Sequence, residues 1–254
     1  MDTQLQGRHA LVTGGGTGIG LAIARMLADK GAKVTITGRR GDVLAEAAAG
    51  HPGLFGLVMD VADEASVVEG CAAAIAARGP VTICVANAGI AEGKSMAKMD
   101  LAFWRNMMAI NLDGAYLTIR ECLGGMLAEG WGRTILVSSV AGIKGLKGAP
   151  AYTASKHGMI GLMRGLSEEY MGSDVTFNAL CPGYTDTDII TRNTQSIAAR
   201  AGIDTDQARQ MMVKTNRHKR LIGVDEVAAV AELLVGPHSG SLNGQVYEIA
   251  GGQM

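Results

Sequence analysis

The sequence is organised around the stretch His9-Ala-Leu-Val-Thr-Gly-Gly-Gly-Thr-Gly-Ile-Gly20. Its first five residues have the apolar character of a buried strand, and a helical pattern begins within the glycines and continues to about residue 29. Glycines at such a turn allow a tight bend, close approach of a ligand to the backbone, and close packing of helix on sheet. The first N–H groups of the helix are free to bind phosphate. The stretch predicts a dinucleotide-binding turn, with these candidate contacts: Gly14, Gly16, Thr17, Gly18, Ile19 and Gly20.

Downstream of this unit, apolar runs of strand length alternate with longer helical patterns. The expected strands are 9–13, 33–37, 54–59, 81–86, 133–138, 175–180 and 245–250, and the longest expected helices are 101–129 and 151–171. This alternation is typical of βαβ units. No repeat or linker divides the chain. We therefore predict a single-domain α/β protein over residues 1–254, with a Rossmann-like, doubly wound parallel sheet of seven strands and helices on both faces.

The composition excludes several classes of function. With 254 residues, 48% of them hydrophobic, the chain can bury a large core. The net charge of −1 does not suggest nucleic acid as a partner, and no apolar run approaches the roughly 20 residues that cross a bilayer. The four cysteines lack the spacing of a metal site or a disulfide framework, so we expect no metal. We expect a cytoplasmic protein in which Cys84 and Cys181 are buried free thiols.

The end of the second strand bears on the choice of cofactor. A site for NAD usually has Asp or Glu here to bind the ribose 2′-hydroxyl, whereas this chain has Gly38, Arg39 and Arg40. Arg39 can pair with a 2′-phosphate. The sequence therefore favours NADP(H) without excluding NAD(H). The alternative is that the two arginines only border a loop.

Two further strand ends are predicted to contact the same cofactor. Asp60 and Val61 follow the third strand and are placed to meet the adenine. The small residues Asn87, Ala88 and Gly89 follow the fourth strand, where they leave room for the cofactor to lie across the strand ends.

A tyrosine and a lysine four residues apart are the strongest candidates for catalysis. Tyr152 and Lys156 fall in the first turns of an expected helix, where positions i and i+4 lie on one face. The cation would favour the phenolate, lower the tyrosine pKa from its reference near ~10, and give an acid/base usable at neutral pH. An isolated pair with this spacing is more often an ordinary surface pair.

Taken together, the motifs resemble the classical short-chain dehydrogenase/reductase family over the whole chain. The resemblance rests on Thr13-Gly-x-x-x-Gly-x-Gly20, Asp60, Ala86-Asn-Ala-Gly89, Asn111-Leu-x-Gly114, Ser138-Ser139, Tyr152-x-x-x-Lys156 and Pro182-Gly183. Ala86 is a departure, since the family often has Asn there. The stretches 149–158 and 181–184 look like those of 3-ketoacyl and aromatic polyketide ketoreductases.

The resemblance implies a role for each residue of the candidate site. Tyr152 would be the acid/base, Ser139 would hydrogen-bond the same substrate oxygen, and Lys156 would tune Tyr152 and hold the nicotinamide ribose. Asn111 would kink the long helix and order a water in a proton relay. Ser138 would be structural. The residues expected to border the nicotinamide are Pro182, Gly183 and Thr187.

The segment 184–222 is expected to form a lid over the substrate. The apolar pocket would be lined by Ile90, Met96, Ile143, Leu146, Tyr184 and Ile189. The basic run 214–220 could meet an anionic carrier such as coenzyme A, although a solvated turn is the simpler reading.

We therefore predict an NAD(P)-dependent oxidoreductase that transfers a hydride between the cofactor and a secondary alcohol or ketone, with a 3-oxoacyl or other β-keto compound as one option. The alternative is a catalytically silent protein on the same fold that senses the dinucleotide or serves as an interaction partner. The resemblance also implies a homotetramer assembled through helices 101–129 and 151–171.

Overall fold

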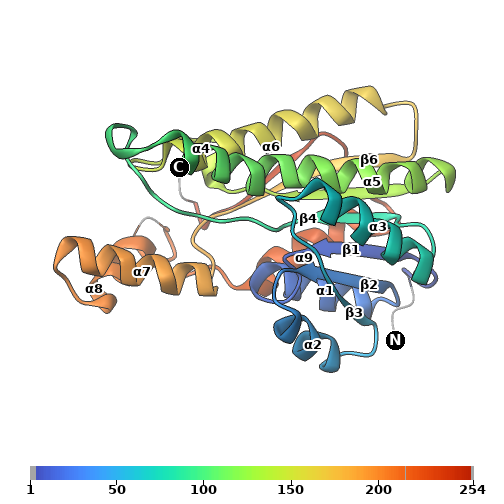
Figure 1. Cartoon of the computed structure of the whole chain (residues 1–254), viewed down its shortest axis with the longest axis horizontal. Helices are drawn as coiled ribbons and strands as arrows, with labels where there is room; N and C mark the ends of the chain where they lie inside the picture. The colour runs from blue at the N-terminus through green and yellow to red at the C-terminus, as the bar shows by residue number, and fades with distance from the viewer. Residues whose placement is uncertain (1–3, 215, 253–254) are drawn as a thin grey trace.

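The computed structural model describes residues 4–214 and 216–252, and its centre is one parallel sheet of seven strands (Figure 1). The strands are β1 (His9–Thr13), β2 (Lys33–Gly38), β3 (Leu54–Val58), β4 (Ile83–Ala86), β5 (Gly132–Val137), β6 (Val175–Pro182) and β7 (Val246–Ile249). Their order is β3-β2-β1-β4-β5-β6-β7. The chain builds outward from β1 and then returns to place β4 at its other side, so a crevice opens where these two carboxyl ends diverge. The predicted fold class is confirmed.

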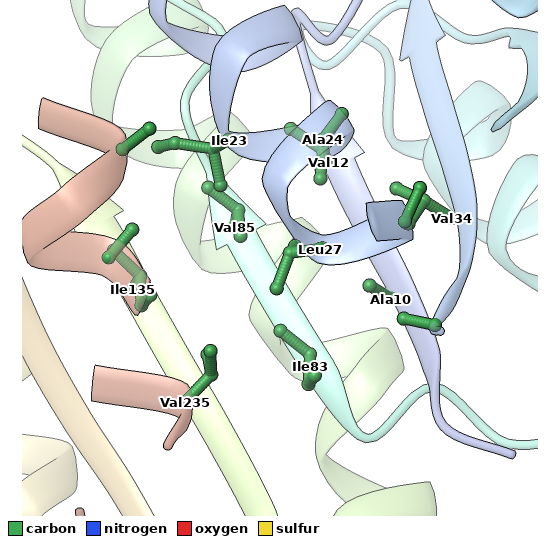
Figure 2. Packing of buried hydrophobic residues seen from close by; sticks show 14 of the residues in the cluster. Ala10, Val12, Ile23, Ala24, Leu27, Val34, Ile83, Val85, Ile135 and Val235 are labelled. Atoms are coloured by element: carbon green, nitrogen blue, oxygen red, sulfur yellow. The ribbon is translucent and has the colours of Figure 1, made fainter. Parts of the chain in front are cut away.

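Helices cover both faces of the sheet. One face carries α1 (Gly18–Asp29), α2 (Gly41–Ala49) and α9 (Val224–Val235); the other carries α3 (Glu64–Arg78), α5 (Gly114–Ala128) and α6 (Pro150–Glu169). Figure 2 shows the first of these layers, where Ile23 and Leu27 of α1 pack on the strands. Within β1, Val12 belongs to this core and Leu11 to the opposite one, and both are fully buried. Burial on both faces explains why the strands read as continuous apolar runs.

The long helix expected over residues 101–129 is divided into three parts. It consists of α4 (Leu101–Met108), a π-helical turn (Ala109–Asp113) and α5. The turn ends at Gly114, where an added Cβ would lie 2.8 Å from the Cβ of Val61. The glycine therefore lets the start of α5 lie directly against Val61, three residues after the end of β3.

The other helix that bears on the site begins as predicted. Pro150 occupies the first turn of α6, where its missing N–H has no helical partner to lose. Tyr152 consequently falls in the first turn, and Lys156 follows one turn later.

The segment 184–222 contains two helices that the sequence analysis did not predict. They are α7 (Asp188–Ala201) and α8 (Thr205–Val213), which pack on each other and stand out from the body of the molecule (Figure 1). A small cluster of Ile190, Met212 and Leu221 holds them together, separate from the two main cores. Short 3-10 turns occur at Met96–Lys98 and Val140–Gly142.

All four cysteines are buried and free, which confirms the prediction made for Cys84 and Cys181. Within the described ranges, the helices lack the combination of length and apolar content that a bilayer crossing requires.

Candidate active site and cofactor cleft

The glycine turn between β1 and α1 has the conformation and the crowding that only glycine tolerates. Gly14 and Gly18 have φ values of +63° and +54°. A Cβ on Gly20 would collide with the carbonyl oxygen of Gly14 and lie 2.5 Å from Nδ2 of Asn87. The predicted functions of these glycines, bending and close packing, therefore have a direct geometric basis.

Asn87 braces this turn from the end of β4. Its Nδ2 donates to the carbonyl oxygens of Thr13 (2.9 Å) and Gly14 (3.2 Å). In return, Oγ1 of Thr13 accepts hydrogen bonds from the backbone N–H groups of Asn87 and Ala88, both at 3.0 Å. The side chain of Asn87 thus fixes the glycine turn against β4, and its amide N–H groups are used for this rather than for binding a ligand.

The N-terminus of α1 is open to an anion. Thr17 occupies the N-cap without making a side-chain capping bond, and the first turn contains no acidic residue. Among the described residues, the first N–H groups of the helix have no side-chain cap, and together with the positive end of the helix dipole they face the cleft.

A cleft of about 410 Å³ runs along the carboxyl ends of β1, β2 and β4. The predicted cofactor residues that line it are Gly14, Gly16, Thr17, Gly18, Ile19, Arg39, Asp60, Val61, Asn87, Ala88, Gly89 and Thr187. The predicted contacts outside its lining are Gly20, Tyr152, Lys156, Pro182 and Gly183. The nicotinamide end of the predicted site therefore lies beyond this cleft, next to Gly89.

Several lining residues were not assigned as contacts from the sequence. They are Thr37, Gly38, Arg40, Val43, Leu44, Met59, Ile90 and Ile110. Gly38 and Arg40 lie beside a predicted contact, so proximity alone could have found them. Val43 and Leu44 enter from α2 and Ile110 from the π-helical turn, and no sequence motif marks those positions.

The chemistry of the lining fits a dinucleotide. Thr37 is fully buried beneath the lining, and its Oγ1 has no hydrogen-bond partner among the described residues. Arg39 and Arg40 are exposed, and neither has an acidic partner within the described part of the chain. A carboxylate oxygen of Asp60 accepts from the N–H of Ala62 at 3.0 Å, which fixes the turn after β3.

Tyr152 and Ser139 meet where β5 and α6 approach each other. Ser139 follows β5 and caps the next 3-10 turn, with its Oγ accepting from the N–H of Ala141 at 3.1 Å. A hydrogen bond joins the hydroxyl groups of Ser139 and Tyr152. Ser139 is 8% exposed and Tyr152 is half-buried, so the pair borders the open space without being covered.

The pKa values of Tyr152 and Lys156 differ from the prediction. Burial raises the pKa of Tyr152, and the hydrogen bond from Ser139 only partly opposes this effect. Burial also lowers the pKa of Lys156 to about 8. Nζ of Lys156 donates to the carbonyl oxygen of Val137 at 2.9 Å and lies 5.9 Å from the centre of the Tyr152 ring. The expected lowering of the Tyr152 pKa by Lys156 is therefore absent here, because burial dominates and the ammonium is bound to a backbone carbonyl.

Asn111 lies within the π-helical turn, so the predicted interruption of the long helix at this residue is confirmed. Its buried amide accepts from the N–H of Ile90 (2.8 Å) and donates to the carbonyl oxygen of Ile90 (3.0 Å) and to Oγ of Ser155 (3.0 Å). A Cβ on Gly89 would lie 3.1 Å from Oδ1 of Asn111 and 3.6 Å from Nζ of Lys156. The structure thus brings the end of β4, the π-helical turn and α6 together at one point.

Ser138 holds the other side of this arrangement. Its hydroxyl donates to the carbonyl oxygen of Lys156 at 3.0 Å, deep in the protein. The thiol of Cys181 on β6 is hydrogen-bonded by Ser138 and by the backbone of Ser139. These contacts support the structural role predicted for Ser138.

The predicted substrate side is apolar and open. Met96 is 75% exposed, Ile143 is 40% exposed, and Ile90, Leu146 and Tyr184 are half-buried. The side chain of Ile189 lies outside the described part of the structure.

Part of the basic run 214–220 is held by structural contacts. Arg220 forms a bidentate pair with Glu226, at 2.6 and 2.9 Å. The side chain of Arg217 lies against Gly252, where an added Cβ would be 2.8 Å from its Cδ. The ring of His218 lies equally close to Gly251. These contacts favour the solvated-turn reading over a carrier-binding surface. Residue 215 lies outside the described residues.

The parallel sheet, the glycine turn at its crevice and the neighbouring Tyr152–Ser139 pair define a dinucleotide-binding oxidoreductase. Residues 8–198 match the family model for short chain dehydrogenases, and the chain belongs to this family. It is an NAD(P)-dependent enzyme that interconverts an alcohol and a carbonyl group by hydride transfer.

Relatives with similar sequences and structures cover nearly the whole chain. The granaticin polyketide synthase putative ketoacyl reductase 1 of Streptomyces violaceoruber is 35% identical over 96% of this chain and 92% of its own. The D-beta-hydroxybutyrate dehydrogenase of Rhizobium meliloti is 32% identical over 96% of this chain and 98% of its own. A crystal structure of a variant actinorhodin polyketide ketoreductase with NADPH superposes with a TM-score of 0.94, at 31% identity, covering 100% and 99% of the two chains.

Proposed function

We propose that the protein is an NADP(H)-preferring carbonyl reductase or alcohol dehydrogenase that acts on a secondary alcohol or ketone with an apolar arm. The observation that carries this proposal is the hydrogen-bonded pair of Tyr152 and Ser139, with Lys156 beside Gly89 at the end of the cleft. Within the single domain, the segment 184–222 would cover the substrate as a lid.

The bound nicotinamide would supply or accept the hydride. In the reducing direction Tyr152 would donate its phenolic proton to the carbonyl oxygen, and Ser139 would hydrogen-bond the same oxygen. The raised pKa of Tyr152 keeps this proton in place at neutral pH. Lys156 would bind the nicotinamide ribose once its ammonium leaves the Val137 carbonyl. Because the amide of Asn111 is already bonded, the water of the proposed relay would bind to its main-chain carbonyl.

Substitution of Tyr152 separates an enzyme from a silent sensor. Tyr152→Phe removes only the hydroxyl, so turnover should fall at least 1,000-fold while the Kd for NADPH changes less than about threefold. Both quantities can be followed by nicotinamide absorbance and fluorescence. Wild-type protein that binds NADPH but reduces none of a panel of ketones, β-keto esters and β-ketoacyl thioesters would support the sensor instead. The relatives named above give that alternative no support.

The preference for NADP(H) rests on the two exposed arginines after β2. Arg39→Asp should shift the ratio of kcat/KM for NADPH over NADH toward NADH by about 10- to 100-fold, since a charge-assisted pair with the 2′-phosphate is lost. Arg217→Asp, a change of the same charge in the basic run, is the matched control. If Arg39→Asp leaves the ratio unchanged, Arg39 does not select the cofactor.

The similarity to a ketoacyl reductase from Streptomyces violaceoruber supports a β-keto substrate. The panel described above tests this preference. Comparing kcat/KM for a β-ketoacyl coenzyme A thioester with that of its short thiol analogue tests the carrier hypothesis. Equal values are expected, because Arg220 is paired with Glu226 and the aliphatic part of Arg217 packs on Gly252.

A homotetramer is proposed through the outer faces of α5 and α6. On α6, an added Cβ on Gly161 or Gly165 meets no atom within 4 Å. On α5, the side chains of Tyr116 and Leu127 are exposed. Small residues on a helix face allow a second helix to approach closely. Light scattering should therefore give four chains for the wild type and fewer for Gly165→Trp.

The four unoxidised thiols support a reducing compartment, and we propose the cytoplasm.

A further inference from the structure

A second tyrosine, Tyr184, lies beside the proposed acid/base. The N–H of Ser138 donates to the carbonyl oxygen of Leu180 on β6 at 2.8 Å, which places Cys181 beside Ser139 and Tyr152. The chain therefore leaves the sheet directly beneath the reacting pair and reaches Tyr184 three residues later. Tyr184 is also close enough to Tyr152 for a charge on one phenol to raise the pKa of the other.

The backbone around Tyr184 is held firmly. The N–H of Gly183 donates to Ile249 at 2.9 Å, and the carbonyl of Tyr184 accepts from the N–H of Ile222 at 2.9 Å. Thr185 then forms a parallel bridge with Ile222, and the N–H of Asp186 donates to the carbonyl of the same residue at 2.9 Å. The backbone of Tyr184 is therefore anchored by the sheet and by the segment before α9.

The ring and the hydroxyl of Tyr184 have different surroundings. The ring packs against the lid cluster of Ile190, Met212 and Leu221. The hydroxyl has no hydrogen-bond partner among the residues that the structure describes, and its oxygen is not sealed from the open space. Burial raises the pKa of this phenol, so at neutral pH it is an available donor.

We propose that Tyr184 is a specificity-determining residue that donates a hydrogen bond to a second oxygen of the substrate, so that the preferred substrates are ketones bearing a further oxygen acceptor near the reacting carbonyl, such as β-keto esters. The two phenols are not hydrogen-bonded to each other, and each can therefore serve a different acceptor on one molecule. This inference rests on the proposed function, because the reacting carbonyl must lie at Tyr152 and Ser139.

The test compares two substrates of nearly equal length that differ in the second oxygen. Ethyl 3-oxobutanoate carries it, and 2-heptanone does not. The wild type should favour the ester in kcat/KM by at least tenfold, and Tyr184→Phe, which keeps the ring packing, should lower this preference at least tenfold. Tyr170→Phe, at the far end of α6, is the control that should leave the preference unchanged.

Binding gives a second readout that does not depend on turnover. Dissociation constants for both ketones are measured with the NADP⁺ complex, in which a ketone cannot be reduced. A loss of ester binding in Tyr184→Phe, relative to 2-heptanone, supports the role of Tyr184. An equal preference in wild type and Tyr184→Phe, in binding or in kcat/KM, overturns it. Failure of the wild type to reduce either ketone, with either cofactor, counts instead against the proposed function.

Discussion

The glycine turn offers the sharpest test of how this structure binds its cofactor. In Gly20→Ala the new methyl group would lie 2.5 Å from Nδ2 of Asn87 and against the backbone of Gly14, where ordinary contacts are about 1 Å longer. Neither neighbour is the flexible end of a long side chain. Overpacking costs about 1–3 kcal/mol, and each hydrogen bond of Asn87 that is displaced adds about 1 kcal/mol. The better helix propensity of alanine returns less than about 1 kcal/mol.

We therefore expect a net loss of about 2–4 kcal/mol in the free energy of unfolding, or roughly 5–15 °C in Tm. Because the same atoms form the phosphate-binding turn, the Kd for NADPH should rise at least tenfold. Thermal unfolding and fluorescence titration measure the two effects. Gly172→Ala is the matched control, since its methyl group meets no atom within 4 Å. A Gly20→Ala protein with the Tm and the Kd of this control would refute the reasoning.

Four further predictions follow from individual contacts. Ser138→Ala should cost about 1–2 kcal/mol of stability with kcat changed less than threefold, whereas Ser139→Ala should lower kcat about 100-fold; equal losses of kcat in both would contradict the assignment. Because burial raises the pKa of Tyr152 above its ordinary value near ~10, the fall of kcat/KM for ketone reduction that belongs to the loss of the phenolic proton should come only above about pH 10, whereas loss of the Lys156 proton near pH 8 should weaken ketone reduction and alcohol oxidation alike; a fall near pH 8 in reduction alone would contradict this assignment. Burial lowers the pKa of His9 below 6.5, so the unfolded chain binds the proton first and stability declines as the pH falls below about 6.5; in urea titrations at pH 7.5 and 5.5 the decline should be smaller for His9→Gln. The four buried thiols should react with a thiol reagent only after unfolding, and a fast-reacting thiol in the native protein would show that the core opens there.

The sheet could be predicted because its physics is local. Strands buried on both faces must be continuous apolar runs, and the helices between them need only the ordinary period of a helix. The bounds of β1 agree with the expectation, and Pro150 marks the start of α6. Fixed spacings then placed Tyr152 and Lys156 one turn apart at the end of the cleft.

What the sequence did not reveal depends on contacts between distant segments. The family resemblance implied a kink at Asn111, but nothing local marked it as a π-helical turn, because the bonds from Asn111 to Ile90 and Ser155 join parts of the chain more than 20 residues apart. Likewise, the carbonyl of Val137 that binds Lys156 could not be inferred from a spacing motif. Helices α7 and α8 are mostly polar and have a small core of their own. The capping box of Asp204 and Gln207 was the one local signal for α8.

The double hydrogen bond between Asn111 and Ile90 makes position 111 sensitive to a very small chemical change. The amide presents a donor to one backbone group of Ile90 and an acceptor to the other. Deamidation to aspartate would keep the shape but replace the donor with an oxygen, which would then face the Ile90 carbonyl at about the present 3.0 Å spacing. Repulsion between two acceptors would loosen the loop after β4, next to Gly89. The ageing of a single side chain could therefore disable an otherwise intact molecule.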